Sequence, residues 1–369
     1  MNFVVTHIWG IPIGLNFSWL IIFALLMFSL ATGLFPSALP GLSAAVVTLA
    51  ALFTTLLFFG SLLAHELGHA YVALREHIPV RGISLFIFGG VAQIDKEPET
   101  PGAEFRIAAA GPLVSFLLGG LFFVIAQLPL PGFVTFAATW LARINLILGA
   151  FNLIPGFPLD GGRLLRALLW KLSGNAYRST KIAAISGQLV AMAFISFGVL
   201  SAFTSNVLNG LWMAFIGWFL LSAASSSLAY ASFQKRLKGT HVSEVMRSEI
   251  PYVPGFMSLK NLVQQYVLGL GHHVMYVGNG ITPEGVISLE NISQIGQARW
   301  PFMTTEQAMT PLHQLVPVDP ETDLVTTLGL MDSRQLTHLP VVKDGQVIGL
   351  ISREDIIKLI EVRRKLKVN

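Results

Sequence analysis

Six long apolar runs constrain this 369-residue chain more than any other feature of its sequence. A helix that crosses a bilayer needs about 20 mainly apolar residues. Runs of this kind lie at about 17–35, 43–74, 106–129, 133–157, 182–203 and 207–231. The fourth run contains Pro155 and Pro158, which should break its helix near the end. The sequence therefore predicts a polytopic α-helical membrane protein with about six transmembrane helices.

Charge separates this part of the chain from the rest. Residues 1–231 contain 10 Lys or Arg and 7 Asp or Glu, whereas the shorter segment 232–369 contains 14 and 13. An ordinary soluble chain has about 25% charged residues, against 12% here overall. We therefore predict a membrane domain over 1–231, a basic linker over 232–240 and a soluble α/β region beyond it. Since neither part carries a strongly basic stripe, nucleic acid is not expected as a partner.

The basic residues also predict an orientation. They gather in alternate connections between the apolar runs, and the connections near 36–42, 130–132 and 204–206 contain no charge. By the positive-inside rule, both termini and the soluble region should be cytosolic in a multi-pass protein of the cell membrane. The N-terminus lacks the basic start of a signal peptide, so the first run is expected to remain as an anchor.

Arg143 is an exception inside the fourth apolar run. It could snorkel to the membrane surface or pair with a neighbouring helix. Alternatively, it could be a functional charge, because buried charges are costly in membranes.

The second apolar run contains a candidate metal site, His65-Glu66-Leu67-Gly68-His69. Positions i and i+4 share one helix face, so both imidazoles can reach one metal ion beside Glu66. The chain has no cysteine, so a zinc site must use His and carboxylate ligands. A structural pair of core histidines is the alternative, and the expense of these polar groups in a membrane span weighs against it.

A zinc site of this kind needs a third protein ligand. Most acidic residues of the membrane half cluster after the second run, and Asp160 closes the broken fourth run before Gly161 and Gly162. Asp160 could be a turn aspartate. By topology it approaches the same side of the membrane as the histidines, which favours it as the ligand. The acidic candidates of the membrane half are Glu76, Asp95, Glu97, Glu99, Glu104 and Asp160.

These motifs together resemble the site-2 protease family of intramembrane zinc metalloproteases. The resemblance covers about residues 8–230 and is carried by HELGH, by Asn152-x-x-Pro155 with Leu159-Asp160-Gly161, and by Ala110-Gly111-Pro112-Leu113. It implies one zinc ion held by His65, His69 and Asp160, with Glu66 as general base. It also implies that Asn152 steadies the substrate or the oxyanion. The implied substrate is a transmembrane segment of another membrane protein, cut near the cytosolic leaflet. Ser115 is assigned no role.

A β-rich stretch with a Gly-Gly break, 82–94, follows the second run. Beside the resemblance, it is interpreted as a short hairpin that dips toward the site. Its edge could pair with an unwound substrate by strand addition, or the hairpin could pack only as a lid.

The soluble region repeats itself with a period near 64. Gly285-Val286-Ile287-Ser288 with Asn291 recurs as Gly349-Leu350-Ile351-Ser352 with Asp355. Such a period indicates a duplicated α/β unit rather than a solenoid. The pattern resembles tandem cystathionine β-synthase-type (CBS) domains, here over 241–300 and 301–363, followed by a basic tail over 364–369.

The CBS resemblance implies a regulatory module that binds ATP or another adenine nucleotide. It places Gly349, Ser352 and Asp355 at a nucleotide site in the second copy, whereas Asn291 puts the first copy's site in doubt. The module could also bind no ligand and only join chains into a dimer or higher oligomer. Two alternatives to a regulated protease are a CBS-regulated channel or transporter and a pseudoprotease that binds membrane partners. The clustering of charges at metal spacing disfavours the first, and the intact Glu66 disfavours the second.

Overall fold

The computed structural model describes residues 2–87, 89–94, 96–204, 206–280, 282–334 and 336–366. By its internal contacts the chain divides into two units, residues 1–231 and 232–369. Three predicted features fall partly outside the described residues. They are position 88 of the hairpin, the acidic candidate Asp95, and residues 367–369 of the basic tail.

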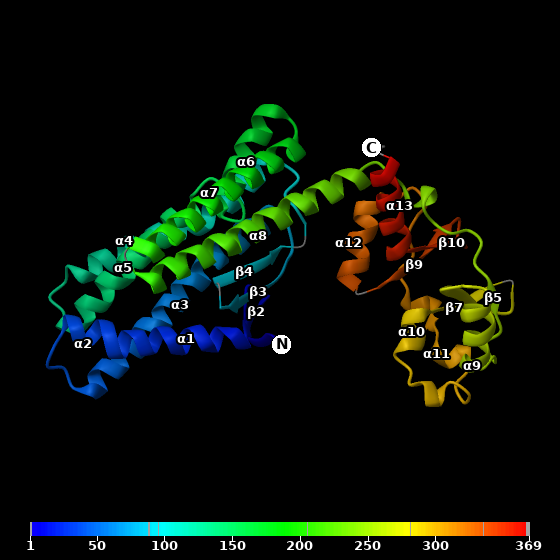
Figure 1. The fold of residues 1–369 in the computed structure, drawn as a ribbon, viewed down its shortest axis with the longest axis horizontal. Helices are drawn as coiled ribbons and strands as arrows, with labels where there is room; N and C mark the ends of the chain where they lie inside the picture. The colour runs from blue at the N-terminus through cyan, green and yellow to red at the C-terminus, as the bar shows by residue number, and fades with distance from the viewer. Residues whose placement is uncertain are drawn as a thin grey trace. The chain divides into compact units, whose positions relative to one another are not determined.

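The first unit contains six helices that are long and apolar enough to cross a membrane, which confirms the predicted spans. The first consists of α1 (Phe17–Ser29), a π-helical turn (Leu30–Leu34) and α2 (Phe35–Ala38). Figure 1 shows these long helices running alongside one another. The remaining five are α3 (Ala44–Arg75), α4 (Pro101–Ala126), α5 (Gly132–Asn152), α7 (Ala176–Thr204) and α8 (Val207–Leu237).

The fourth run breaks as its prolines predicted. Helix α5 ends at Asn152, and a non-helical segment leads to a separate short helix, α6 (Asp160–Ser173). The loop is fixed against α7, because the backbone N–H of Phe157 donates to the carbonyl of Ala183 at 3.1 Å. Helix α8 continues to Leu237, so the first part of the predicted linker 232–240 is helical.

A four-stranded sheet accompanies the helices, where the sequence predicted only the hairpin 82–94. Its order is β1 (Asn2–Ile8), β2 (Ile11–Asn16), β3 (Val80–Phe86) and β4 (Gly89–Ile94). Strands β1 and β2 join through Trp9 and Gly10, both with positive φ. A two-residue hairpin turn of this kind suits the twist of its strands. Strand β2 pairs in parallel with β3, so the N-terminal hairpin extends the predicted one.

The sheet packs against the C-terminal part of α3. Ala70 is fully buried with Ile11, Ile13 and Ile83 in one apolar cluster. Strand β4 forms the sheet edge beyond β3. The sheet therefore lies beside the helix segment that carries the HELGH motif.

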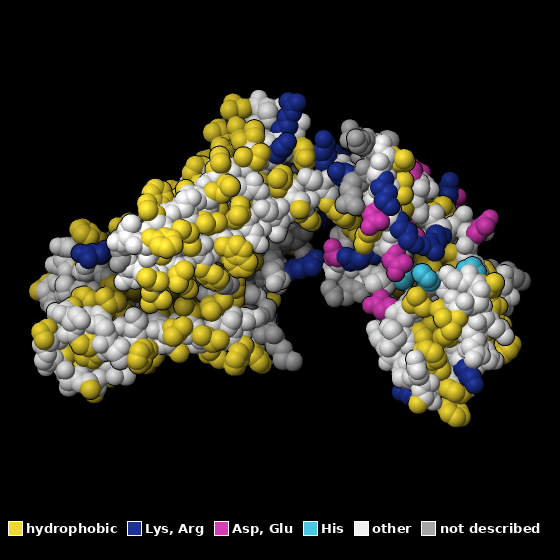
Figure 2. All heavy atoms as spheres, in the orientation of Figure 1, with side chains coloured by type: hydrophobic (Ala, Val, Ile, Leu, Met, Phe, Trp, Pro, Cys, Tyr) yellow, Lys and Arg dark blue, Asp and Glu magenta, His cyan; other side chains and the backbone are white. Residues whose placement is uncertain are grey.

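Apolar side chains cover the outer faces of the helices, as expected for contact with lipid. Figure 2 shows hydrophobic side chains spread over most of the visible surface of the helical unit. Between helices, small residues allow close approach, a common feature of membrane helix packing. Gly68 of α3, for example, lies against Ala110 and Val114 of α4.

The second unit is a duplicated α/β module with two small sheets, one in the order β5-β6-β7-β8 and one pairing β10 with β9. The repeats exchange short segments. Strand β8, which opens the second repeat, pairs with β7 of the first, and Arg247 of the first forms a bridge to Leu350 of the second. Three apolar clusters fill the unit, and one of them joins Tyr276 and Val286 of the first repeat to Leu350 of the second. Its strands and longer helices are β5 (Tyr252–Val253), α9 (Leu259–Leu262), β6 (Val274–Gly278), β7 (Pro283–Ser288), α10 (Leu289–Ser293), α11 (Thr305–Ala308), β8 (Thr310–Pro311), α12 (Leu324–Arg334), β9 (His338–Lys343), β10 (Gln346–Ser352) and α13 (Arg353–Leu366).

Candidate metal centre and catalytic cavity

Helix α3 presents the two histidines of the HELGH motif inside the membrane unit. His65 and His69 are one helical turn apart on one face, and their side chains are only 4% and 6% exposed. The Nε2 atoms of the two rings lie 3.3 Å apart. The i, i+4 spacing predicted that the two imidazoles share one helix face, and in the structure their Nε2 atoms do point at the same place.

Asp160 reaches this place from the first position of α6. Its Oδ2 atom lies 3.2 Å from Nε2 of His65 and 3.2 Å from Nε2 of His69. The break after α5 makes this possible, because a continuous helix would carry Asp160 past the histidines. Of the acidic candidates in the sequence, Asp160 is the one that the described structure brings to the histidine pair.

The three atoms form a nearly equilateral triangle that fits zinc. Tetrahedral ligands at about 2.0–2.1 Å from zinc lie about 3.3 Å from one another, close to the 3.2–3.3 Å between these three atoms. Nδ1 of His69 can only donate to the carbonyl of Ile107, 2.7 Å away. In neutral His69, the Nε2 lone pair therefore faces a carboxylate oxygen and a second ring nitrogen, an arrangement that a cation stabilises.

Helix α4 forms hydrogen bonds with the Nδ1 atoms of both imidazoles. Besides the bond from His69 to Ile107, Nδ1 of His65 lies 2.8 Å from the hydroxyl oxygen of Ser115, which is fully buried. Hydrogen bonds to the second ring nitrogen orient metal-binding histidines and set their tautomer. Ser115 has no predicted role from the sequence, because its contact with His65 depends on the packing of α4 against α3.

Gly111 of α4 leaves the space that the three donor atoms face. A Cβ atom on Gly111 would lie 2.2 Å from Nε2 of His69 and 2.6 Å from Nε2 of His65. Any side chain at this position would therefore occupy the centre itself. Within the Ala110-Gly111-Pro112 motif, Gly111 thus contributes to the site because it has no side chain.

Glu66 lies between the histidine pair and the sheet, in the same cavity as His65 and His69. Its Oε2 atom accepts a hydrogen bond of 3.2 Å from the backbone N–H of Ala92 in β4. Gly90 of the same strand lies so close that a Cβ atom there would be 2.5 Å from Cγ of Glu66. The predicted hairpin therefore packs directly on Glu66 and holds its carboxylate.

These side chains line a cavity of about 690 Å³ in the membrane unit. Asn152, the last residue of α5, also lines it and donates from Nδ2 to the carbonyl of Leu148 at 3.1 Å. Most of the remaining wall is apolar and comes from α1, α5 and α8, including Leu25, Phe151 and Trp212. The cavity thus offers a small polar centre inside an apolar pocket.

Arg143 lies away from this cavity. Its side chain is exposed on α5, and it forms no salt bridge with the residues that the structure describes. Pairing with a neighbouring helix, one of the predicted alternatives, is therefore not observed in the described part of the chain.

In the second unit, the predicted nucleotide residues are already engaged. Oδ1 of Asp355 accepts a bond of 2.8 Å from Nε of Arg247, and its Oδ2 accepts one of 2.6 Å from the Ser352 hydroxyl. Both Ser352 and Asp355 are buried. Gly349 packs against the backbone of Arg247, because a Cβ atom there would lie 2.7 Å from that carbonyl oxygen.

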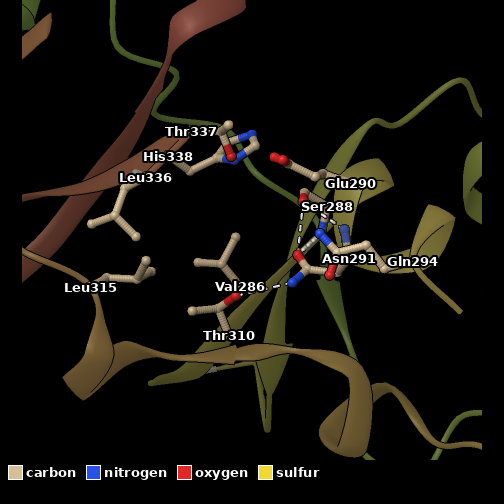
Figure 3. Close-up of a pocket in the computed structure, with 10 residues that line it drawn as sticks. All are labelled: Val286, Ser288, Glu290, Asn291, Gln294, Thr310, Leu315, Leu336, Thr337 and His338. Carbon is tan, nitrogen blue, oxygen red and sulfur yellow. Dashed lines mark hydrogen bonds between the residues drawn. The ribbon is translucent and has the colours of Figure 1, made fainter. Parts of the chain in front are cut away.

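The equivalent place in the first repeat opens on a pocket of about 250 Å³. Figure 3 shows Asn291 bonded to Ser288 and to Thr310, with Glu290 and His338 on the neighbouring wall. Burial lowers the pKa of His338 below its ordinary value. A second cavity of about 230 Å³ shares Ser288 and His338 and reaches Ser352.

Two family models match this chain. The family model described as peptidase family M50 matches residues 53–135 and 131–197, and the model of the CBS domain matches residues 306–362. A solved site-2 protease from Methanocaldococcus jannaschii is 33% identical, with 62% of this chain and 95% of that chain covered and a TM-score of 0.42.

Relatives named as zinc metalloproteases match along almost the whole chain. Rip3 of Mycobacterium tuberculosis is 36% identical over 96% of this chain and 92% of its own length. The protein sll0528 of Synechocystis is 35% identical over 98% of this chain and 96% of its own length. This chain therefore belongs to peptidase family M50, and it is a multi-pass membrane zinc metalloprotease of the site-2 protease type with a C-terminal CBS module.

Proposed function

We propose that this protein is an intramembrane endopeptidase that cuts a transmembrane segment of another membrane protein near the cytosolic leaflet. The observation that carries the proposal is the meeting of donor atoms of Asp160 and of two histidines of a membrane span, His65 and His69, within 3.3 Å of one another in the same cavity as Glu66. The apolar wall of the cavity suits an apolar peptide. Its polar centre suits hydrolysis of a peptide bond.

In this proposal, His65, His69 and Asp160 hold one zinc ion per chain, and Ser115 and Ile107 orient the imidazoles. When bound, zinc would supply a Lewis acid that polarises the scissile carbonyl and lowers the pKa of water to about 7. Glu66 takes the proton of the attacking water at its carboxylate and returns it to the leaving amine nitrogen, so the base becomes the acid. Asn152 steadies the substrate or the oxyanion with its amide.

The orientation is proposed from charge. With the basic connections on the cytosolic side, both termini and the CBS module are cytosolic. Pairing of β2 with β3 supports this arrangement, because it joins the N-terminal segment to the basic connection after α3 in one sheet. Water and the polar end of a substrate then reach the site from the cytosol.

The hairpin offers two ways to act on a substrate. Strand β4 is the sheet edge beside Glu66, so its outer side could pair with an unwound substrate segment. It could also act only as a lid on Glu66. A proline at Phe86 or Ile87 separates these roles. Strand addition predicts loss of cleavage with zinc retained, and unchanged cleavage would contradict it.

We propose further that the CBS module regulates cleavage through an adenine nucleotide. Two observations support a ligand there, namely the pocket beside Ser288 and Asn291 and the cavity that contains Arg247, Arg353 and Ser352. At Ser352 and Asp355 a nucleotide would have to displace Arg247. Titration of the purified full chain with ATP and AMP tests this regulation. Absence of both binding and any change in cleavage would remove it.

Self-association through the CBS module, into a dimer or higher oligomer, belongs to the same proposal. Light scattering of the full chain in detergent measures the mass directly. A strictly monomeric chain would contradict it.

Glu66→Gln tests the enzymatic proposal most directly. This substitution removes the base but keeps the size of the side chain, so zinc content should stay near one per chain while cleavage of a co-expressed membrane protein is lost. His65→Ala is the matched control that should lose both zinc and cleavage. Cleavage retained by Glu66→Gln would overturn the mechanism.

A further inference from the structure

One charged residue of the catalytic cavity has no place in the mechanism above. The charged and titratable residues that line the cavity are His65, Glu66, His69, Asp160 and Arg163. The first four form the metal centre and its base. Arg163 is the remaining one, and it is a permanent cation at any physiological pH.

The neighbouring arginine on α6 is paired with carboxylates of the protein itself, unlike Arg163. Arg166, one turn further along, donates to Glu104 at 3.1 Å and to Glu97 at 2.7 Å. Its side chain is 12% exposed and that of Glu104 is fully buried. These bonds commit both nearby carboxylates to Arg166.

Arg163 has no such bond. It is half-buried, and its backbone N–H donates to the carbonyl of Leu159, but its guanidinium makes no hydrogen bond or ion pair with any residue in the described ranges. Glu104 is near enough to feel its charge, but its bonded partner is Arg166. Arg163 is therefore a guanidinium that lines the cavity with its donors uncommitted to the described protein.

The position of Arg163 relates it to the scissile bond. Residues three apart share one face of a helix, so Arg163 lies on the same face of α6 as Asp160, about 4.5 Å further along the axis. The rest of the wall is mainly apolar. When an apolar peptide fills the cavity and removes water, an unpaired guanidinium there becomes costly unless the peptide brings an anion.

We propose that Arg163 is a specificity residue that pairs with an acidic side chain of the substrate close to the scissile bond. This inference rests on the proposed protease function. The planar guanidinium can bind a carboxylate through two parallel hydrogen bonds, which gives both strength and a defined position. The preferred substrate is then an apolar segment that contains one Asp or Glu at a fixed distance from the cut.

The test uses quenched fluorescent peptides and the full chain in detergent micelles. Each peptide has about 14 apolar residues with a single Glu moved through successive positions, and a matched peptide has Gln at the same place. At one position, we expect kcat/KM of the Glu peptide to exceed that of the Gln peptide about tenfold or more. A hydrogen-bonded pair of opposite charges stabilises a complex by this amount.

Substitutions of Arg163 then test whether this residue causes the preference for Glu over Gln. Arg163→Gln should remove the difference between the Glu and Gln peptides, and Arg163→Glu should create a preference for Lys at the same position. Lys171→Gln is the matched control, since it makes the same charge change at an exposed position of the same helix. Zinc content of each variant reports an intact centre.

Three outcomes would overturn the inference. The wild-type chain could show no Glu preference at any position, or Arg163→Gln could keep that preference. Alternatively, Arg163→Gln could slow the Glu and Gln peptides equally, which would mean a role in the reaction or in folding rather than in specificity. Failure of the protease proposal looks different, because Glu66→Gln would then match the wild type on every peptide.

Discussion

At the scale of single residues, Gly111 shows that a missing side chain can be part of a metal site. Zinc and one open position need free volume where three donor atoms converge, and Gly111 faces this volume from α4. The sequence marked the glycine as part of a family motif. Its purpose follows only from the 2.2 Å between a Cβ atom there and Nε2 of His69.

We therefore predict that Gly111→Ala reduces zinc content to well below one ion per chain, because the methyl group would occupy the centre. Metal analysis of the purified protein measures this. Gly120→Ala on the same helix is the control, since a Cβ atom there meets nothing within 4 Å. Equal zinc content in the two variants would show that the space at Gly111 is not needed.

Ser115 gives a second prediction at this scale. Ser115→Ala removes the bond to Nδ1 of His65, and loss of such a partner typically lowers metal affinity by about 10–100-fold. Competition with a zinc chelator measures the change. Ser226→Ala is the control, because that exposed serine of α8 bonds only to its own helix. If both variants kept full affinity, Ser115 would not support the ligand.

At the scale of elements, strand β4 positions Glu66, the proposed general base. The strand approaches Glu66 closely at Gly90 and donates to it from Ala92. A sheet edge can lie this near a helix only where its residues are small. The hairpin prediction from 82–94 was correct in kind, but the contact with Glu66 depends on the packing of the whole sheet on α3.

Gly90→Ala should therefore slow cleavage about tenfold or more while zinc stays bound, because the added Cβ atom would push the Glu66 side chain out of position. A fluorescent peptide assay with metal analysis separates the two effects. Gly33→Ala, where a Cβ atom meets nothing within 4 Å, serves as control. Normal turnover of Gly90→Ala would mean that Glu66 tolerates this displacement.

At the scale of the whole molecule, the duplicated module repeats one contact with different chemistry. Arg247 of the first repeat bonds to Asp355 of the second, and at the corresponding positions Thr310 of the second repeat bonds to Asn291 of the first. Both bonds join an exchanged segment to the neighbouring repeat. The asymmetry between Asp355 and Asn291 is thus matched by the partner of each residue.

This pairing predicts a compensating double substitution. Arg247→Ala leaves the buried Asp355 without its partner and should destabilise the exchanged segment by about 1–3 kcal/mol. Arg247→Thr combined with Asp355→Asn copies the first repeat and should recover most of the loss. Hydrogen exchange of residues near Arg247 and Leu350, followed by mass spectrometry in the full chain, measures both. Additive losses in the double variant would contradict the pairing.

The sequence by itself determined the spans, the break before Asp160, the two-histidine face and the duplication. These features depend on local rules, namely run length, proline, helical period and repetition, and each can be read within one segment of chain. The tertiary structure places Asp160 at the histidines, as topology and the family resemblance predicted, and it alone decided that Ser115, Gly111 and Ala92 contact the site. It also decided that Asp355 is bonded to Arg247 and that the guanidinium of Arg163 has no hydrogen-bond partner among the described residues. Contacts between distant segments depend on how helices and strands pack against one another, and no local pattern encodes that packing.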